Sequence, residues 1–582
     1  MLLHDGATIS QGCEWFGPRF SKTGAHSSCK YHNLKGHRFI LQEMNQSLSS
    51  LMVTPTTTIS EILNTFLQSE KDLLLVDESS VIADPHLELL TDYPRSSSAA
   101  LVAVEKNGDT LVRQNRVASA SSASHKVTIG NRKFVGAMRL SQKQRDDIRT
   151  ALESAALAKA QGNALDLVLV ALVRAMIKVD AAEVWAAPYC RSSDKKVRDE
   201  TSRAISQLNM GAVRLRMANR ANDGFFSVFF LRKCSKLLTW LAVKVGATPN
   251  QVTLISFAIG LYSAFSFAQG SFWQIFLGAV LLQLSIIVDC VDGELARYTR
   301  QFSQLGAWLD AVTDRVKEYM VFMGLAIGAE KNGKDLWIPA MAMMVIQTFR
   351  HLSDYNFAAV VRIRGEETFA KPVEFMAEFD GIVPIEQPPK GRLRYWLGKI
   401  IQFPIGERWL VISASAVIGG AAFTFTVMPI LAAISAIVVY RGRIIKTREM
   451  PRTPITKPLI SDQSDLLGMK RSFTKRFDWL EPSLLRLIEA LFLIWVFASV
   501  DQIGIASYMI IFSIVFHHYD NLYRALQGEK KPAWLSTLGM FVGGRILLLG
   551  IAAIQEWPLQ YFAWYFGPAF LTSFITAMGL GT

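Results

Sequence analysis

The sequence has few of the residues that cross-link small domains. Its 582 residues include five cysteines, and no two of them form a C-x-x-C pair. This scatter argues against a disulfide framework and against a zinc ribbon. The first residues are polar and lack the apolar core of a signal peptide. We expect residues 1–45 to be a disordered leader, or an over-long gene start with Met44 as the true beginning.

Charge of one sign is in excess, and apolar residues are abundant. The formal net charge is +13, and half of the residues are hydrophobic. Such a balance suggests either nucleic acid or an anionic membrane surface as the partner. The basic residues cluster between apolar segments rather than in one interleaved patch. We therefore predict a membrane protein that contacts lipids and does not bind nucleic acid.

The N-terminal third is typical of a soluble α/β domain, which we expect over residues 46–205 on the cytoplasmic side. Lys71–Asp84 indicates a buried strand, a turn and a second short strand, and Ala99–Glu105 is another compact apolar run. Val135–Leu140 precedes a helix over Ser141–Gln161, and Leu165–Val179 is a further helix or strand. Strands that alternate with helices predict an α/β layer.

Apolar runs recur from residue 250 onward, and several approach the ~20 residues that cross a bilayer as a helix. Lys and Arg crowd the loops after the fourth, sixth and eighth runs, whereas 269–272, 499–503 and 555–559 have none. This bias predicts a multi-pass protein of the cell (plasma) membrane with both termini cytoplasmic. The ten predicted spans are 251–269, 273–290, 306–328, 336–357, 408–424, 426–440, 483–500, 503–518, 535–553 and 560–578.

Four aspartates mark the second and third predicted spans. Asp289 and Asp292 are three residues apart, and Asp310 and Asp314 are four apart, so each pair shares a helix face. A loop of about ten residues makes the two helices antiparallel neighbours, and the four carboxylates can then converge. Because four anions in one place repel one another, bound divalent cations are expected. Hard oxygen ligands favour Mg²⁺ or Mn²⁺, and we expect two ions. Helix capping in a loop would explain any one of these aspartates, but not all four.

The same stretch resembles the signature of a known family. D-x2-D-G-x2-A-R-x8-G-x3-D-x3-D, running from Asp289 to Asp314, is similar position by position to the CDP-alcohol phosphotransferases. Thr248–Thr253, just before the first span, also resembles the helix start of that family. The resemblance covers roughly 223–441 and implies a six-helix membrane core, which we place at 206–445. A basic cytoplasmic linker over 446–479 and a C-terminal membrane domain over 480–582, with about four spans, complete the predicted bundle.

The resemblance also implies roles for individual residues. Asp289, Asp292 and Asp310 would hold the metal ions, and Asp314 would touch one of them and act as the general base. Asp289, Gly293, Ala296 and Arg297 would contact the CDP portion of the donor. The implied partners are a CDP-alcohol such as CDP-diacylglycerol, a polyol or polyol-phosphate acceptor, and a second copy of the chain in a homodimer.

A polar stripe on the fourth span suggests where the acceptor binds. Gln347, Arg350, His351 and Asp354 follow one helix face. A buried stripe of this kind lines a cavity rather than facing lipid. We predict that Arg350 and His351 bind a polar acceptor, with Arg315 and Lys317 adding positive charge beside Asp314. The alternative is a stripe that faces the cytoplasmic loop, with Arg350 paired to Asp354.

The flanking regions resemble less well-defined families. The N-terminal region is distantly similar to MobA-like nucleotidyltransferases, with Asp77 as the metal-binding aspartate and Phe134–Met138 as a later active-site strand. No Gly-rich loop that would hold a triphosphate occurs in residues 1–75. A degenerate, regulatory or docking domain is therefore favoured over one that makes the CDP-alcohol. Residues 480–582 resemble an uncharacterised membrane segment of actinobacterial proteins. Its His517–Asp520 stretch indicates a second site, an interface with the core or simple interfacial anchoring.

Together these features predict a membrane transferase of phospholipid biosynthesis that moves a phospho-alcohol, or phosphatidyl, group to an acceptor hydroxyl and releases CMP. A different class of protein, a transporter or scaffold that keeps the acidic motif as an ion site, is the main alternative. A bifunctional cytidylyltransferase and phosphotransferase is the other.

Overall fold

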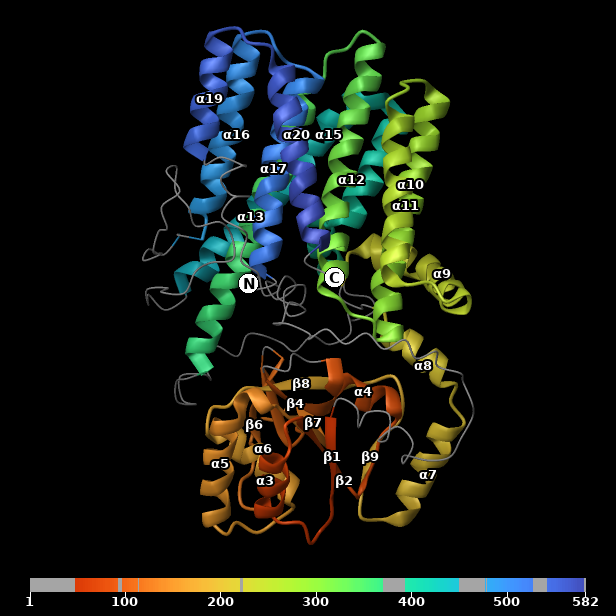
Figure 1. The fold of residues 1–582 in the computed structure, drawn as a ribbon. Helices are drawn as coiled ribbons and strands as arrows, with labels where there is room; N and C mark the ends of the chain where they lie inside the picture. The colour runs from red at the N-terminus through yellow and green to blue at the C-terminus, as the bar shows by residue number, and fades with distance from the viewer. Residues whose placement is uncertain are drawn as a thin grey trace. The chain divides into compact units, whose positions relative to one another are not determined.

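The computed structural model describes residues 48–92, 97–113, 115–219, 223–369, 393–449, 477, 479–526 and 542–579. They form two compact units: one contains residues 48–217, and the other contains 218–367 with the helices from Leu393 on (Figure 1). The expected leader, most of the basic linker and the start of the ninth predicted span lie outside the described residues.

The N-terminal unit is built on a seven-stranded mixed sheet. The strand order is β1-β2-β7-β4-β8-β6-β5, with β1 parallel to β2 and β7 antiparallel to both of its main neighbours, β2 and β4. The two strands expected within Lys71–Asp84 are confirmed, and the apolar stretches Ala99–Glu105 and Val135–Leu140 also belong to strands. The strands are β1 Leu48–Val53, β2 Asp72–Asp77, β4 Ser98–Val104, β5 Thr110–Arg113, β6 Arg116–Ala120, β7 Arg132–Leu140 and β8 Val179–Val184, and β3 Ser80–Val81 pairs separately with β9 Cys190–Arg191.

Helices cover both faces of this sheet. α3 (Ile59–Gln68), α5 (Arg145–Leu157) and α6 (Ala164–Arg174) pack on one face, and α4 (Asp84–Asp92) packs on the other. A capping box fixes the start of α3. The Thr58 side chain accepts a hydrogen bond from the Glu61 amide, and the Glu61 carboxylate accepts one from the Thr58 amide. The ambiguous stretch 165–179 is a helix that leads into β8. α7 (Lys195–Ser206) and α8 (Met210–Met217) end the unit.

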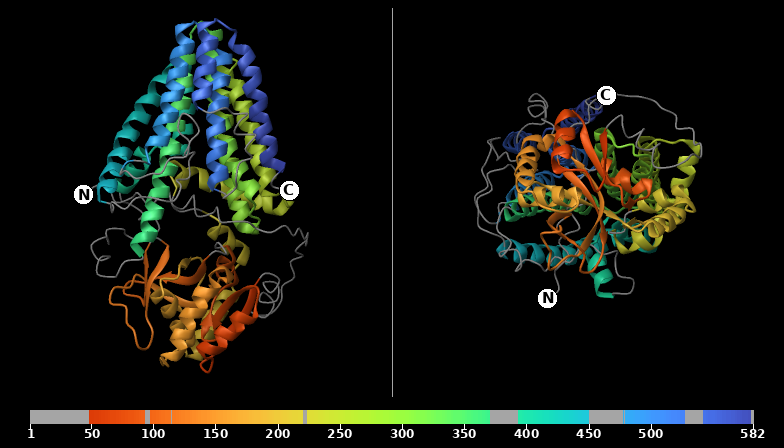
Figure 2. Two further views of the ribbon diagram at one scale, coloured as in Figure 1. Left: turned by 60° about the vertical axis from the view of Figure 1, so that its left-hand side comes forward. Right: turned by 90° about the horizontal axis from the view of Figure 1, so that it is seen from below.

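The second unit is a bundle of long helices, which run alongside one another in Figures 1 and 2. Helices coincide with each described part of the ten predicted spans. They are α9 Arg232–Val245, α10 Pro249–Phe267, α11 Phe272–Thr299, α12 Gln304–Lys331, α13 Trp337–Phe369, α14 Leu393–Ile401, α15 Ile405–Glu449, α16 Glu481–Ser499, α17 Ile505–Leu526, α19 Val542–Ile554 and α20 Leu559–Gly579.

α15 is interrupted by a reversal at Gly420, where the backbone adopts φ 69° and ψ −167°. Only glycine takes such a conformation without strain. The Ser415 hydroxyl lies 3.0 Å from the Thr424 hydroxyl, and the Ser435 hydroxyl reaches the Gln402 carbonyl at 3.1 Å. In a straight helix the first pair would be about 13 Å apart. The two parts of α15 on either side of Gly420 are therefore the arms of one hairpin, and the reversal lies inside the fifth predicted span, 408–424, rather than between it and the sixth.

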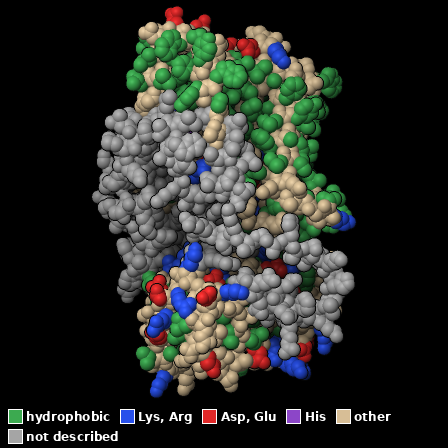
Figure 3. Space-filling model, in the orientation of Figure 1, with side chains coloured by type: hydrophobic (Ala, Val, Ile, Leu, Met, Phe, Trp, Pro, Cys, Tyr) green, Lys and Arg blue, Asp and Glu red, His purple; other side chains and the backbone are tan. Residues whose placement is uncertain are grey.

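The surface of the bundle is that of a membrane protein. Trp273, Ile418 and Trp564 are each at least 75% exposed, and hydrophobic side chains cover much of the visible face of the helices in Figure 3. Among the described residues, three helices are long and apolar enough to cross a bilayer: α11, α15 and α16. Lipid satisfies an apolar surface of this extent, whereas water does not.

A large hydrophobic core connects α12, α13, α15 and α17. Trp308 and Phe322 of α12, Trp337 of α13 and Trp409 of α15 share it with Tyr508 of α17. The helices beyond residue 480 are therefore packed into the bundle rather than appended to it. This packing gives the polar side chains described below fixed positions.

Candidate active site

α10 holds α11 and α12 together at the predicted site. It packs along both helices, and close backbone approach is required, because a Cβ at Gly324 would lie 2.2 Å from the Ala264 carbonyl oxygen. α11 ends in a left-handed residue, Arg300, and the Ser303 side chain caps α12 by accepting from the Gly306 amide at 2.9 Å. The expectation that α11 and α12 pair directly thus needs refinement, since each of them packs mainly along α10 here.

Three of the four predicted carboxylates converge. Oxygen atoms of Asp289, Asp292 and Asp310 all lie within 4.8 Å of one another. Asp292 is buried, whereas Asp310 faces outward. The spacing of three residues on α11 and the reversal before α12 bring these groups to one place, as the sequence predicts. Carboxylate oxygens at this separation form a donor set that suits a hard divalent cation.

Two hydroxyl groups of α10 orient the α11 carboxylates. The Thr253 hydroxyl donates to Asp292 Oδ2 at 2.6 Å, and the Ser256 hydroxyl donates to Asp289 Oδ1 at 3.1 Å. We did not predict roles for these residues. A signal was present, because Thr253, Ser256 and Gly260 follow one face of a helix that otherwise reads as a membrane span.

The fourth carboxylate, Asp314, joins the site through a lysine. The Lys317 ammonium group lies 2.6 Å from Asp289 Oδ1 and 3.1 Å from Asp314 Oδ1. Its side chain is fully buried and passes Gly260, where a Cβ would lie 2.7 Å from the lysine stem. Lys317 was predicted to bind the acceptor, but in the structure its ammonium group forms ion pairs with Asp289 and Asp314.

The other predicted nucleotide contacts, Gly293, Ala296 and Arg297, lie on α11, one to two turns after Asp289. The Arg297 guanidinium group passes over Gly293, where a Cβ would lie 3.2 Å from Arg297 Nη1. Arg297 Nε donates to the Ala218 carbonyl. Gly293 and Ala296 thus leave the helix backbone open beside the acidic group, which is the space that a nucleotide needs.

The polar stripe of α13 divides into two parts. His351 lies against Arg315, whose Nη1 is 3.1 Å from His351 Nε2. Arg350 instead donates to the Gln402 carbonyl, and Asp354 pairs with Arg443 of α15. Arg350 and Asp354, which the alternative paired with each other, therefore bond to other groups. Arg315 also contacts Glu318, which Arg408 holds through two hydrogen bonds of 2.9 and 3.0 Å.

Asp77, the predicted metal-binding aspartate of the N-terminal unit, forms an ion pair with an arginine. Asp77 Oδ2 accepts from Arg191 Nε at 2.9 Å and Nη2 at 2.7 Å, and Asp77 Oδ1 accepts from the Ser79 amide and hydroxyl. Burial raises the pKa of Asp77, but the Ser79 amide and Arg191 outweigh it and hold the pKa below its usual value. Arg191 lies far along the chain in β9, and nothing in the sequence around Asp77 indicated it.

The bundle and its acidic site define a class of protein: a membrane protein with a carboxylate centre suited to divalent cations. Residues 246–377 match the CDP-alcohol phosphatidyltransferase family, and residues 412–567 match a family of unknown function, DUF5941. The chain therefore contains a CDP-alcohol phosphatidyltransferase domain. The second match begins within α15, which we had assigned to the core.

Named relatives align over part of their length. The chain is 31% identical over 159 residues to the bifunctional IPC transferase and DIPP synthase of Archaeoglobus fulgidus, covering 27% of this chain and 29% of the relative. It is 34% identical over 119 residues to the phosphatidylinositol phosphate synthase of Streptomyces avermitilis, covering 20% and 47%. It is 37% identical over 84 residues to the archaetidylinositol phosphate synthase of Pyrococcus horikoshii, covering 14% and 43%. The chain thus spans less than half the length of these relatives.

Proposed function

We propose that this protein transfers a phospho-alcohol group from a CDP-alcohol to an acceptor hydroxyl and releases CMP. The observation that carries this proposal is the convergence of Asp289, Asp292 and Asp310 inside the matched family domain. In the reaction a bond forms between the acceptor oxygen and the β-phosphorus. The bond from that phosphorus to the bridging oxygen breaks, and the oxygen leaves with CMP.

The acidic group would hold Mg²⁺ or Mn²⁺, with two ions expected. The donor set consists of carboxylate oxygens, which both metals prefer. Thr253 and Ser256 fix the orientation of two of these ligands and so act as supporting residues of the kind that metal sites require. The bound metals would stabilise negative charge on the diphosphate and on the leaving CMP.

Asp314 would accept the proton of the acceptor hydroxyl. Its Oδ1 lies 3.1 Å from the Lys317 ammonium group, which holds the carboxylate in place. Lys317 also pairs with Asp289, so one buried cation links the proposed base to the proposed metal site. Gly293, Ala296 and Arg297 would receive the CDP portion, which requires Arg297 to exchange its bond to the Ala218 carbonyl for a phosphate.

The acceptor would bind between Asp314 and the α13 stripe, near Arg315, Arg350 and His351, with Lys317 adding charge. Gln347 supports this location, because its buried amide has no hydrogen-bond partner among the described residues. A buried amide of this kind needs a polar neighbour. The names of the relatives favour a polyol phosphate such as inositol phosphate as acceptor, with glycerol phosphate as another candidate. CDP-diacylglycerol is the proposed donor, which places the reaction in phospholipid biosynthesis.

For the N-terminal unit we propose a regulatory or docking role rather than cytidylyl transfer. Asp77, the counterpart of a metal ligand in the resemblance, accepts two hydrogen bonds from Arg191. The same guanidinium group donates to Asp166 Oδ1 at 2.6 Å. A metal would have to displace this pair. A bifunctional enzyme remains the alternative that the relative from Archaeoglobus fulgidus suggests, and formation of a CDP-polyol from CTP by the full chain would support it.

The architecture that we propose is a six-helix core followed by about four further spans, in the domain order given under Sequence analysis. Both termini lie in the cytoplasm, and the plasma membrane is the proposed location. A homodimer is expected from the family resemblance. The basic end of the second arm of α15 supports this orientation, because Arg441, Arg443, Lys446 and Arg448 lie in its last turns.

The proposal is tested by CMP release in proteoliposomes that contain radiolabelled CDP-diacylglycerol and a panel of polyol phosphates. The wild type should release CMP only with Mg²⁺ or Mn²⁺. D314N should lose this activity, whereas D501N, which changes an exposed aspartate of the same unit, should keep it. Acceptor flux that needs no metal and persists in D314N would instead support the transporter.

A further inference from the structure

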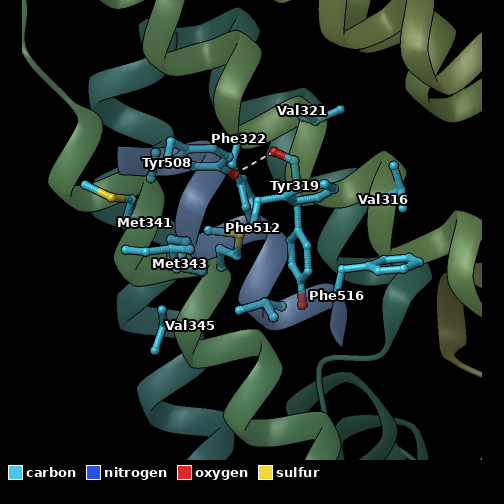
Figure 4. Close-up of a cluster of buried hydrophobic side chains, with 14 of the residues drawn as sticks. Val316, Tyr319, Val321, Phe322, Met341, Met343, Val345, Tyr508, Phe512 and Phe516 are labelled. Atoms are coloured by element: carbon cyan, nitrogen blue, oxygen red, sulfur yellow. Dashed lines mark hydrogen bonds between the residues drawn. The ribbon is translucent and has the colours of Figure 1, made fainter. Parts of the chain in front are cut away.

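The helices matched to the family of unknown function share a tight interface with the proposed catalytic domain. Tyr508, Phe512 and Phe516 of α17 pack beside Tyr319 and Phe322 of α12 (Figure 4). The Tyr508 hydroxyl donates to the Tyr319 carbonyl oxygen at 2.7 Å. The rings of Tyr319 and Phe512 meet edge to face, with centroids 6.3 Å apart. Such an interface can hold a polar side chain in one fixed position.

A series of hydrogen-bonded polar side chains crosses this interface and ends at Arg315, the residue after Asp314. Arg315 Nη1 lies 3.1 Å from His351 Nε2, and His351 Nδ1 lies 2.9 Å from the Tyr519 hydroxyl. The Tyr519 hydroxyl lies 3.0 Å from that of Tyr319, which is 3.1 Å from the Thr348 hydroxyl. The Thr348 hydroxyl donates to the Met344 carbonyl at 2.8 Å.

The two ends of this series of hydrogen-bonded groups, Arg315 and the Met344 carbonyl, fix the direction of every hydrogen bond in it. A guanidinium group only donates, so His351 Nε2 must accept, and the proton of the neutral imidazole lies on Nδ1. Tyr519 therefore accepts from His351 and donates to Tyr319. Tyr319 in turn donates to Thr348, whose own proton goes to the backbone. Each hydroxyl has one role, and the tautomer of His351 follows from the presence of Tyr519.

Tyr519 is almost completely buried, and its ring stacks on Tyr523 with centroids 6.0 Å apart and planes 15° apart. Without its hydroxyl, the Nδ1–H of His351 would lose its acceptor. The imidazole would then turn or change tautomer, because a buried donor without a partner is costly. Either change removes one of the two contacts that hold Arg315 in place, the other being its ion pair with Glu318.

We infer that Tyr519 is a positioning residue for acceptor binding, acting through His351 on Arg315. The C-terminal helices thereby complete the acceptor pocket of the phosphotransferase domain, which gives the segment of unknown function a role. This inference rests on the proposed function. Tyr519 itself is not expected to touch the reacting atoms, so its loss should weaken acceptor binding and leave the chemical step in place.

The test compares Y519F with Y508F in proteoliposomes, using CDP-diacylglycerol, Mn²⁺ and inositol phosphate as acceptor. Both variants remove one buried tyrosine hydroxyl from α17, but only Tyr519 is bonded to His351. Y519F should raise the KM for the acceptor by about tenfold, the value of one well-placed hydrogen bond, with kcat within about twofold. Y508F should change neither constant, and the KM for the donor should stay the same in both.

A second variant separates positioning from a general loss of stability. In an H351A background, adding Y519F should raise the acceptor KM no further, because the two residues act in one chain. Two results overturn the positioning role: an equal acceptor KM in Y519F and Y508F, or a full additional effect of Y519F in H351A. In either case, metal-dependent CMP release by the wild type would still support the proposed reaction. Absence of that CMP release overturns the proposed function and this inference with it.

Discussion

Lys317 Nζ lies 2.6 Å from Asp289 Oδ1, at the centre of the acidic site. The lysine is fully buried, and its ammonium group also reaches Asp314. A buried cation between two carboxylates relieves repulsion that would otherwise oppose folding. It would also compete with a bound metal ion for Asp289. The site therefore balances an internal cation against the external ones that the proposed reaction needs.

This balance predicts the behaviour of K317M. Removing the ammonium group leaves Asp289 and Asp314 without their shared counter-ion, so the melting temperature of the metal-free protein in detergent should fall. Mn²⁺ should then raise the melting temperature more than it does in the wild type, since the freed carboxylates bind the metal more tightly. K334M, which removes an exposed lysine, is the control. A smaller Mn²⁺ response in K317M would show that Lys317 does not compete with the metal.

Thr253 provides a second test of the metal site. T253V keeps the shape of the side chain but removes the hydrogen bond to Asp292, which leaves that ligand free to rotate. Loss of a supporting bond of this kind typically weakens metal affinity by about 10–100-fold. Titration of Mn²⁺-dependent CMP release should show this shift. T426V, at an exposed threonine bonded only within its own helix, should leave the titration unchanged; equal curves for T253V and wild type would refute the role.

The close contact between α10 and α12 predicts that G324A destabilises the bundle. The added methyl group would meet the Ala264 carbonyl oxygen at 2.2 Å, so the helices must separate. Overpacking of this kind costs about 1–3 kcal/mol. G550A adds the same methyl group where nothing lies within 4 Å. Unfolding in mixed detergent should show a lower midpoint for G324A alone, and similar midpoints for both variants would contradict the packing.

His86 predicts acid sensitivity in the N-terminal unit. Burial lowers its pKa from 6.5 to about 4, and neither ring nitrogen has a hydrogen-bond partner within the described part of the chain. The unfolded chain takes up the proton first, so stability is retained above pH 6.5 and is lost as the pH falls toward 4. At pH 5 the loss should be about 2 kcal/mol.

Hydrogen exchange of the full chain at pH 5 and pH 7 measures this loss. Exchange through α4 and β4 should be faster at pH 5 in the wild type, and H86L should reduce the difference between the two pH values. H125Q, at a partly exposed histidine, is the control. An unchanged pH dependence in H86L would show that His86 does not cause it.

Much of this site could be predicted from the sequence, because its main features are local. The spacing of Asp289, Asp292 and Asp310 on helices joined by a short turn is enough to bring their carboxylates together. The long apolar helices also follow from composition, although the reversal at Gly420 is visible only as a glycine in an apolar run. Asp314 differs, because its link to Asp289 runs through Lys317, and the sequence does not fix where that long side chain points.

Contacts between distant segments could not be predicted. Arg191 reaches Asp77 from a strand more than a hundred residues later, and Tyr519 reaches His351 from the C-terminal helices. Neither local spacing nor periodicity encodes such pairs, because they depend on how whole elements pack. The direct pairing expected between α11 and α12 needs refinement for the same reason, since α10 packs along both.

The account depends most directly on where a divalent cation binds. Crystals of the full chain grown with Mn²⁺ and measured at its absorption edge locate the ion by anomalous scattering. We predict a peak about 2.2 Å from carboxylate oxygens of Asp289, Asp292 and Asp310. A peak elsewhere with these three carboxylates bare, or no peak at saturating Mn²⁺, would contradict the account.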